Sequence, residues 1–499
     1  MTVVRITEAP LELGELLAVV DGARVEIDDA VRARIAAGRA VVDHALTVGE
    51  AVYGMTTQVG HGKDTRLTEV EIRGQQQFLV VSHSGGIGRP LATPIVRAAL
   101  AVRLNGIARG GSGAGVPVAE VLAALLNAGV HPVVPETASV GAGDLAQMAG
   151  MAQVAIGMGR AEYRGEVLPG GEALRRARIA PLVLGGKDGL ALISANAVSV
   201  GHAAVVVARA KRVADAADVA AGLSMEATSA NISVLHPAVG RAKPINGQVA
   251  AADHLRGLLS GSSLMDSSGN RSVQDSLSFR VVPQVHGALR EYVTAAEHAV
   301  SVELNAAADN PLVSVPDQAL ISNGNFHPMV LVIACEALRI ALAHVGQLSE
   351  RRMAHLWDGF FRQTASGLPP TVPYGLQLRY PAAAVFPELK QLAGVASLDT
   401  PPLEMGVEDH STGAPLVVRK TDTALGLLED LLAIELLLAR DLLAITPTHP
   451  VLGTGTAAAL RMVEEAIAAA DPYPDAVHHA LRDRFPLHST NQHAPAPPD

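Results

Sequence analysis

Residues 136–150 read ETASVGAGDLAQMAG, a loop in which Ala142 is followed directly by Gly143. Around this loop, Gly and Pro punctuate the first 197 residues, as in TTQVGHGKD (56–64) and RGGSGAGVP (109–117). Gly and Pro favour turns and interrupt regular elements. We therefore predict that residues 1–197 form a region of short elements and many loops.

From about residue 198 the sequence changes to long apolar stretches with helical periodicity. Three of them exceed the usual length of a globular helix: Val198–Met225, Phe326–Trp357 and Lys420–Ile445. Helices of this length bury their apolar faces against each other or against other subunits. The pattern predicts a mainly α protein, with a long-helix bundle and oligomerisation region over residues 198–485. Residues 486–499 are rich in proline and polar side chains, and we expect them to be disordered.

The composition excludes several classes of protein. The 499-residue chain is 49% apolar and 3% aromatic, and its net charge of −10 argues against nucleic-acid binding. Its single cysteine, Cys335, rules out an internal disulfide framework and fits a reducing cytoplasm. The N-terminus has no signal-peptide pattern, and no uncharged apolar run is long enough for a membrane span. Without a cysteine pair or HExxH, the sequence predicts no metal site.

The loop at 136–150 resembles the signature SVGASGDLAPLA of the histidine and phenylalanine ammonia-lyase superfamily. Other family segments follow in the same order along nearly the whole chain. They include VQDSLSFRVVPQV (273–285), ELNAAADNPLV (303–313), NGNFH (323–327), LSERR (348–352) and EDH (408–410). The resemblance implies an ammonia-lyase-like helical bundle with a loop-rich N-terminal active-site region. It also implies a homotetramer whose pockets combine residues of several subunits and bind a small-molecule substrate.

The chain departs from the family at the group that carries the chemistry. In the family, an internal Ala-Ser-Gly cyclises to an electrophilic methylidene-imidazolone ring, and the serine hydroxyl is eliminated to form its alkene. Here the corresponding loop, Ala142, Gly143 and Asp144, has no serine between its first two residues. We therefore predict that the ring is absent and that the protein has no other cofactor.

By resemblance, the substrate-binding residues are largely kept. Tyr53 corresponds to the catalytic base, and Arg280 to the arginine that binds the substrate carboxylate through its bidentate guanidinium. Ser82-His83 together with Glu408 resembles the histidine-using branch, because a carboxylate and an imidazole can both hydrogen-bond an imidazole ring. Gln274 and Phe326 complete the expected lining, although His83 and Phe326 also fit plain structural roles.

Residues that support the ring in the family are altered together. Ser194 stands where the family has a ring-supporting asparagine, with Asn196 displaced by two positions, and Leu277 replaces a tyrosine. We assign Tyr53, Ser194 and Glu408 as the catalytic set. The residues that support the ring are altered, whereas the residues that hold the substrate are kept. This pattern favours an enzyme with changed chemistry over an enzyme that has lost its activity.

Three functions remain open from the sequence. The first is a ring-independent lyase, in which Tyr53 abstracts a proton and a good leaving group is eliminated, or the reverse Michael-type addition occurs. Its substrate is a small carboxylate with an imidazole-like or other cyclic side chain. The second is a conventional histidine or aromatic amino acid ammonia-lyase. The third is a non-catalytic ligand-binding or scaffold protein.

Overall fold

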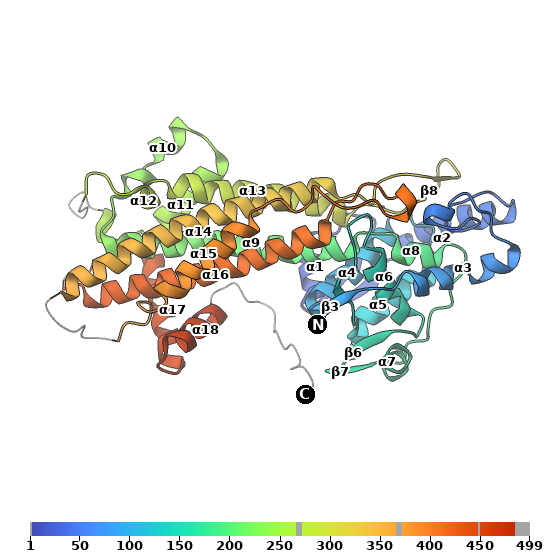
Figure 1. Cartoon of the computed structure of the whole chain (residues 1–499), viewed down its shortest axis with the longest axis horizontal. Coiled ribbons are helices and arrows are strands. Elements are labelled where there is room, and N and C mark those ends of the chain that lie inside the picture. The colour runs from blue at the N-terminus through green and yellow to red at the C-terminus, as the bar shows by residue number, and fades with distance from the viewer. Residues whose placement is uncertain (1, 266–271, 366–371, 448–449, 485–499) are drawn as a thin grey trace.

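Three long helices dominate the structure, a computed structural model that describes residues 2–265, 272–365, 372–447 and 450–484. They are α9 (Ala197–Thr228), α14 (Met329–Thr364) and α16 (Ala414–Ile445), and they lie side by side along the length of the molecule (Figure 1). The mainly α fold and its long-helix bundle are confirmed. The predicted disordered tail, 486–499, lies outside the described residues.

Short elements precede the bundle, as the Gly and Pro pattern predicts. The helices are α1 (Leu13–Val20), α2 (Asp29–Thr47), η1 (Gly60–Gly62), α3 (Glu69–Ser82), α4 (Thr93–Ala108), α5 (Val116–Ala128), α6 (Leu145–Ala155), α7 (Gly170–Ala177) and α8 (Asp188–Ile193). The strands are β1 (Val3–Ile6), β2 (Arg24–Ile27), β3 (Ile87–Pro90), β4 (Val130–Pro132), β5 (Pro135–Thr137), β6 (Arg160–Tyr163) and β7 (Glu166–Pro169). β1 and β2 pair in parallel, whereas β3–β5 and β4–β6–β7 are antiparallel.

The second part of the chain adds further helices around the three long ones. These are η2 (Ile232–Leu235), α10 (Pro237–Ala242), α11 (Asn246–Leu258), η3 (Ser263–Met265), α12 (Leu277–Arg280), α13 (Val282–Leu304), α15 (Arg379–Leu392), η4 (Glu404–Gly406), α17 (Thr454–Ala469) and α18 (Pro474–Arg484). One antiparallel hairpin, β8 (Leu312–Ser314) with β9 (Ala319–Ile321), follows α13.

Small residues let the first part of the chain pack closely on the bundle. α9 is rich in alanine, and its Gly201 faces α4 so closely that a Cβ there would lie 2.7 Å from the backbone nitrogen of Ala99. Any larger residue at this position would force the two helices apart. The contact fixes the first turns of α9 beside the loop-rich region, where the candidate site lies.

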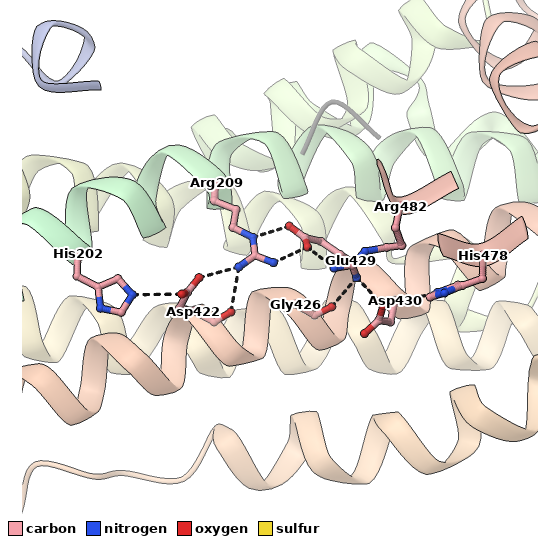
Figure 2. A network of polar contacts seen from close by, with 8 residues as sticks. All are labelled: His202, Arg209, Asp422, Gly426, Glu429, Asp430, His478 and Arg482. Atoms are coloured by element: carbon pink, nitrogen blue, oxygen red, sulfur yellow. Dashed lines mark hydrogen bonds and ion pairs between the residues drawn. The ribbon is translucent and has the colours of Figure 1, made fainter. Parts of the chain in front are cut away.

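Charged side chains between α9, α16 and α18 attach the C-terminal helix to the bundle (Figure 2). Arg209 of α9 binds Glu429 of α16 (Nε to Oε1, 2.7 Å), and Arg482 of α18 binds the same carboxylate at 2.9 Å. Arg209 also donates to Asp422 at 2.6 Å, and Asp422 contacts His202 at 3.2 Å. Glu429 is fully buried, and a buried carboxylate is stable only when it is paired in this way.

Two segments are long and apolar enough to cross a membrane by length and composition, although we expected none. They are residues Asp188–Thr228 and helix α14. The most apolar stretch of the first segment is 94% buried inside the molecule, and the most apolar stretch of α14 is 56% buried. Helices that are apolar all round also form protein cores, so these two are weak evidence for a membrane span.

Candidate active site

Tyr53 lies in the loop between α2 and η1, where its half-buried hydroxyl accepts a hydrogen bond from the backbone N–H of Gly60 at 3.0 Å. Burial raises the pKa of Tyr53 above its ordinary value, and the nearby carboxylates of Glu408 and Glu404 raise it further. The Gly60 N–H acts in the opposite direction, because it stabilises the phenolate. Tyr53 and Glu408 therefore meet within one chain.

A small hairpin carries both carboxylates to this position. The backbone N–H of Leu403 donates to the carbonyl of Glu408 at 2.9 Å, and the two residues form an isolated β-bridge. The bridge closes the segment around η4 and holds Glu404 and Glu408 near each other. Burial raises the pKa of Glu408, and the negative charge of Glu404 adds to the increase.

His83 lies at the C-terminal end of α3, as part of the same group of side chains. Its Nδ1 is 2.9 Å from the carbonyl oxygen of Leu79, which can only accept, so Nδ1 carries the proton and Nε2 is the acceptor in the neutral ring. The pKa of Glu404 is held below its usual range mainly by His61, with His83 also contributing. His83 therefore lies near Glu404, whose charge also acts on Tyr53.

The loop at 139–144 is a tight turn whose backbone groups are well paired. Gly141 and Gly143 both have positive φ (84° and 75°) and form a bridge across Ala142. The hydroxyl of Ser139 accepts from the N–H of Gly141 at 3.0 Å and donates to the carbonyl of Gly143 at 2.9 Å. From the segment just before α16, the hydroxyl of Thr412 donates to the carbonyl of Gly141 at 2.7 Å.

Asp144 closes this loop at the N-terminus of α6. Its backbone N–H donates to the carbonyl of Ala195 at 2.8 Å, and its carboxylate accepts from the N–H and hydroxyl of Ser199 at 2.7 and 3.0 Å. The side chain is fully buried, and burial raises its pKa to about 6 in spite of these hydrogen bonds. Asp144 therefore ties the loop to the first turn of α9.

The residues of this loop do not fit the family's ring. An imidazolone forms when a backbone nitrogen attacks the carbonyl two residues earlier, and its methylidene carbon is the Cβ of the middle residue. Closing on the carbonyl of Ala142 would use the nitrogen of Asp144 and place Gly143 in the middle. Glycine has no Cβ, so such a ring would lack the electrophilic alkene.

Ser194 and Asn196 lie next to the loop at 139–144, on the segment that joins α8 to α9. The hydroxyl of Ser194 accepts from the backbone N–H of Asn310 at 3.4 Å, a long hydrogen bond. Asn196 is buried, and neither its amide oxygen nor its amide nitrogen has a hydrogen-bond partner within the described residues. Its side chain lines a cavity of about 20 Å³ together with Ala195 and Glu303.

Glu303, on α13, faces this cavity, and burial raises its pKa from 4.5 to about 7. A carboxyl with a raised pKa contributes stability below pH 4.5, and that stability is lost as the pH rises through 7. We expect Glu303→Gln to raise the unfolding temperature at pH 8 by roughly 2–6 °C and to have little effect near pH 4. Calorimetry checks this, with the exposed Glu465→Gln as control. Equal unfolding temperatures at pH 8 would contradict it.

Phe326 lies beside the loop, where its carbonyl accepts from the N–H of Gly143 at 3.3 Å. Its ring contacts that of His327 (centroids 5.2 Å apart), which in turn lies 5.4 Å from the ring of His410. The segment of Phe326 thus adjoins the turn at Gly143, close to the start of α14.

Gln274, Leu277 and Arg280 lie elsewhere. They belong to α12 and the segment before it, at one end of the bundle, whereas α2 and α3 lie at the opposite end (Figure 1). Gln274 is exposed, the side chain of Leu277 is 60% exposed, and Arg280 is half-buried. One chain therefore does not bring Arg280 to Tyr53.

Two residues of the site were missed from the sequence. Glu404 and His61 contact each other, with Glu404 Oε2 2.9 Å from Nδ1 of His61. The only sequence signal for Glu404 was its position four residues before Glu408 in the same loop. Nothing in the surrounding GHG motif distinguished His61 from an ordinary loop histidine.

Comparison with known proteins identifies the family of the chain. The family model of the aromatic amino acid lyases matches residues 11–465. The chain belongs to this family. As a lyase of this family, it is 36% identical over 451 residues to histidine ammonia-lyase of Caldanaerobacter subterraneus subsp. tengcongensis (89% of this chain, 88% of that one). It is 38% identical to histidine ammonia-lyase of Anaeromyxobacter sp. strain K (88% of this chain, 90% of that one).

Several solved structures share the fold of this lyase over nearly its whole length. One is the ergothioneine-degrading enzyme ergothionase from Treponema denticola, solved in complex with desmethyl-ergothioneine sulfonic acid. It superposes with a TM-score of 0.91 at 26% identity, covering 98% of this chain and 100% of that chain. Histidine ammonia-lyase from Trypanosoma cruzi superposes with a TM-score of 0.85 at 29% identity, covering 97% and 93%.

Proposed function

We propose that this lyase eliminates a quaternary amine from the betaine of an imidazole-type amino acid, without a methylidene-imidazolone ring. The observation that carries the proposal is the direct bond between Ala142 and Gly143, which leaves no serine to form the electrophile. The base, Tyr53, and the polar groups His83 and Glu408 are nevertheless present together. The proposed chemistry therefore keeps proton abstraction and dispenses with covalent activation of the amine.

The choice of leaving group follows from this loss. A primary amine leaves poorly unless an electrophile or a proton has first made its nitrogen cationic. A trimethylammonium group already carries the positive charge and leaves as neutral trimethylamine, with no proton to place. The absence of the serine thus favours a substrate whose nitrogen is fully methylated.

The surroundings of Tyr53 support a cationic substrate. The carboxylates of Glu404 and Glu408 both act electrostatically on the phenol, and an aromatic ring with adjacent carboxylates suits a quaternary ammonium group. A bound cation would also favour the phenolate, which burial and the two carboxylates disfavour. The ergothioneine-degrading neighbour supports the same class, since ergothioneine is the trimethylammonium betaine of a thiol-substituted histidine.

Each residue then has a defined part in the reaction. Tyr53, as the phenolate, takes a proton from the carbon bonded to the ring, a C=C bond forms, and the C–N bond breaks with its electron pair leaving on nitrogen. His83 and Glu408 hydrogen-bond the imidazole-type ring, and Arg280 of another copy binds the carboxylate. Michael-type addition of the amine is the same path in reverse.

A homotetramer with composite pockets is part of the proposal. Arg280 and Tyr53 lie at opposite ends of one chain, so a pocket that contains both needs a second copy. α14 also exposes apolar side chains along one face, with Val330 70% and Ile333 60% exposed, which is typical of an oligomer interface. We also expect a cytoplasmic location, because the only cysteine, Cys335, is buried and free.

A conventional histidine ammonia-lyase is the second candidate. The 36% identity to the Caldanaerobacter enzyme favours it, since that relative spans most of the chain. This alternative requires an electrophile that the loop at Ala142 does not supply by the family's chemistry.

An assay with two substrates tests the proposed function. The purified protein is incubated separately with ergothioneine and with L-histidine, and amine release is followed by proton NMR while the conjugated acrylate is followed by ultraviolet absorbance. We expect trimethylamine and the acrylate from ergothioneine and no urocanate from histidine. Urocanate from histidine, with ergothioneine left intact, would contradict the proposal.

Intact-protein mass spectrometry tests the absence of the ring. The mass is expected to equal that of the encoded chain, and borohydride should not change it. The matched variant carries a serine inserted between Ala142 and Gly143, in which the loss of two waters becomes chemically possible. A deficit of two waters in the unaltered protein, localised to a peptide that contains Gly143, would show that a ring forms.

A further inference from the structure

Two neighbouring backbone N–H groups of η1 bind two different side chains of the site. The N–H of Gly60 donates to the hydroxyl of Tyr53 at 3.0 Å, and the N–H of His61 donates to Oε2 of Glu404 at 3.2 Å. The same carboxylate oxygen lies 2.9 Å from Nδ1 of the His61 ring. Glu404 therefore binds η1 through two nitrogens of one residue, directly beside the donor to the base.

The fit between these groups is tight. A Cβ at position 60 would lie 2.3 Å from Oε2 of Glu404, and Gly60 has a φ of +58°, so glycine is required on both counts. Glu404 and Met405 also have positive φ values of 50° and 55°, which costs free energy for residues with a side chain. Met405 is almost fully exposed, so its own burial does not offset that cost. The contacts of Glu404 with His61 are interactions that can hold this conformation.

We propose that Glu404 is a positioning residue, which fixes η1 through His61 so that the Gly60 N–H stays on the Tyr53 hydroxyl. The inference rests on the proposed function for the role of Tyr53 as the base. The charged and titratable groups that act on this region are Glu404, Glu408, His61 and His83.

Glu404 acts on the phenol in two opposite ways. Its negative charge raises the pKa of Tyr53, whereas the Gly60 hydrogen bond that it holds in place lowers that pKa by the larger amount. Two substitutions separate these effects. Glu404→Gln removes the charge and keeps a side-chain oxygen for His61, while Glu404→Ala removes both.

The test is an NMR titration of the unliganded protein with ¹³C-labelled tyrosine, with the Tyr53 resonance assigned from Tyr53→Phe. We expect Tyr53 to titrate at a lower pH in Glu404→Gln than in the wild type. In Glu404→Ala it should titrate about 0.5–1 pH unit higher than in Glu404→Gln. Equal titration in the two variants would overturn the inference, because Glu404 would then act by charge alone.

His61→Ala provides a second variant, which changes no residue of the strained hairpin itself and removes only one of the two contacts of Glu404 with residue 61. The His61 side chain is 62% exposed, so its removal should leave the fold intact, which circular dichroism checks. The backbone N–H of position 61 remains, so we expect Tyr53 to titrate above wild type, by less than the difference between the two Glu404 variants. An unchanged titration would contradict the proposed role of Glu404 in positioning η1. None of these measurements needs a substrate, so a failed ergothioneine assay would reject the proposed function and leave this result standing.

Discussion

Tyr53→Phe is expected to lower kcat/KM for the quaternary betaine by roughly 10²- to 10⁴-fold, the usual contribution of a positioned general base. The substitution removes only the hydroxyl that accepts from Gly60 and keeps the half-buried ring. Steady-state kinetics on ergothioneine measure the effect. Tyr473→Phe on the loop before α18, where the side chain is exposed, is the matched control and should keep full activity.

The role of Tyr53 as the base also predicts the direction in which kcat/KM changes with pH. Because burial and two carboxylates raise the pKa of Tyr53 above its ordinary value, only a small fraction of the free enzyme carries the phenolate at neutral pH. We therefore expect kcat/KM to rise with pH from neutral into the alkaline range, and the residual activity of Tyr53→Phe to lose that dependence. A Tyr53→Phe enzyme with wild-type rate and profile would remove Tyr53 from the mechanism.

Arg280→Ala is expected to weaken binding of the substrate carboxylate by roughly 2–4 kcal/mol if the pair is desolvated in the assembled pocket. Arg280→Lys should restore only part of this loss, because an ammonium group cannot form the bidentate fork. Calorimetric titration with the betaine measures both variants. The exposed Arg461→Ala on α17 is the control for loss of a positive charge, and it should bind as wild type does.

Complementation shows whether the pocket is composite. Tyr53→Phe and Arg280→Ala should each have low activity alone at a limiting substrate concentration. Co-expression in equal amounts should restore roughly a quarter of the pockets if the two residues come from different copies. Tyr53→Phe co-expressed with Glu408→Gln is the matched comparison, since those two residues lie together in one chain. Recovery in the second mixture equal to that in the first would contradict the arrangement.

The long helices could be predicted from the sequence because their apolar periodicity extends over many turns. The predicted helix 198–225 is observed at Ala197–Thr228, and 420–445 lies within the observed Ala414–Ile445. The positions where the helices begin and end were predicted less well. α16 begins directly after Gly413, whose φ of 63° is a local turn conformation that the apolar periodicity of the helix does not predict. Helix length was therefore easier to predict than helix boundaries.

The site was only partly predictable. Motif resemblance identified Tyr53, His83 and Glu408, which the fold brings together. The resemblance implied a pocket shared between subunits but not the position of each residue in one chain, and the structure places Arg280 at the end of the bundle opposite to α2 and α3. Glu404 was missed because its position depends on a strained hairpin and on a glycine at position 60, neither of which has a pattern along the chain.

The central claim is that the loss of the serine between Ala142 and Gly143 moved the chemistry to a leaving group that needs no electrophile. A leaving-group series tests it most directly. The same thiol-substituted histidine is supplied with a primary amine, a dimethylamino group or a trimethylammonium group, and amine release is measured under single-turnover conditions. The account predicts turnover of the trimethylammonium compound alone. Release of ammonia from the primary amine at a comparable rate would contradict it.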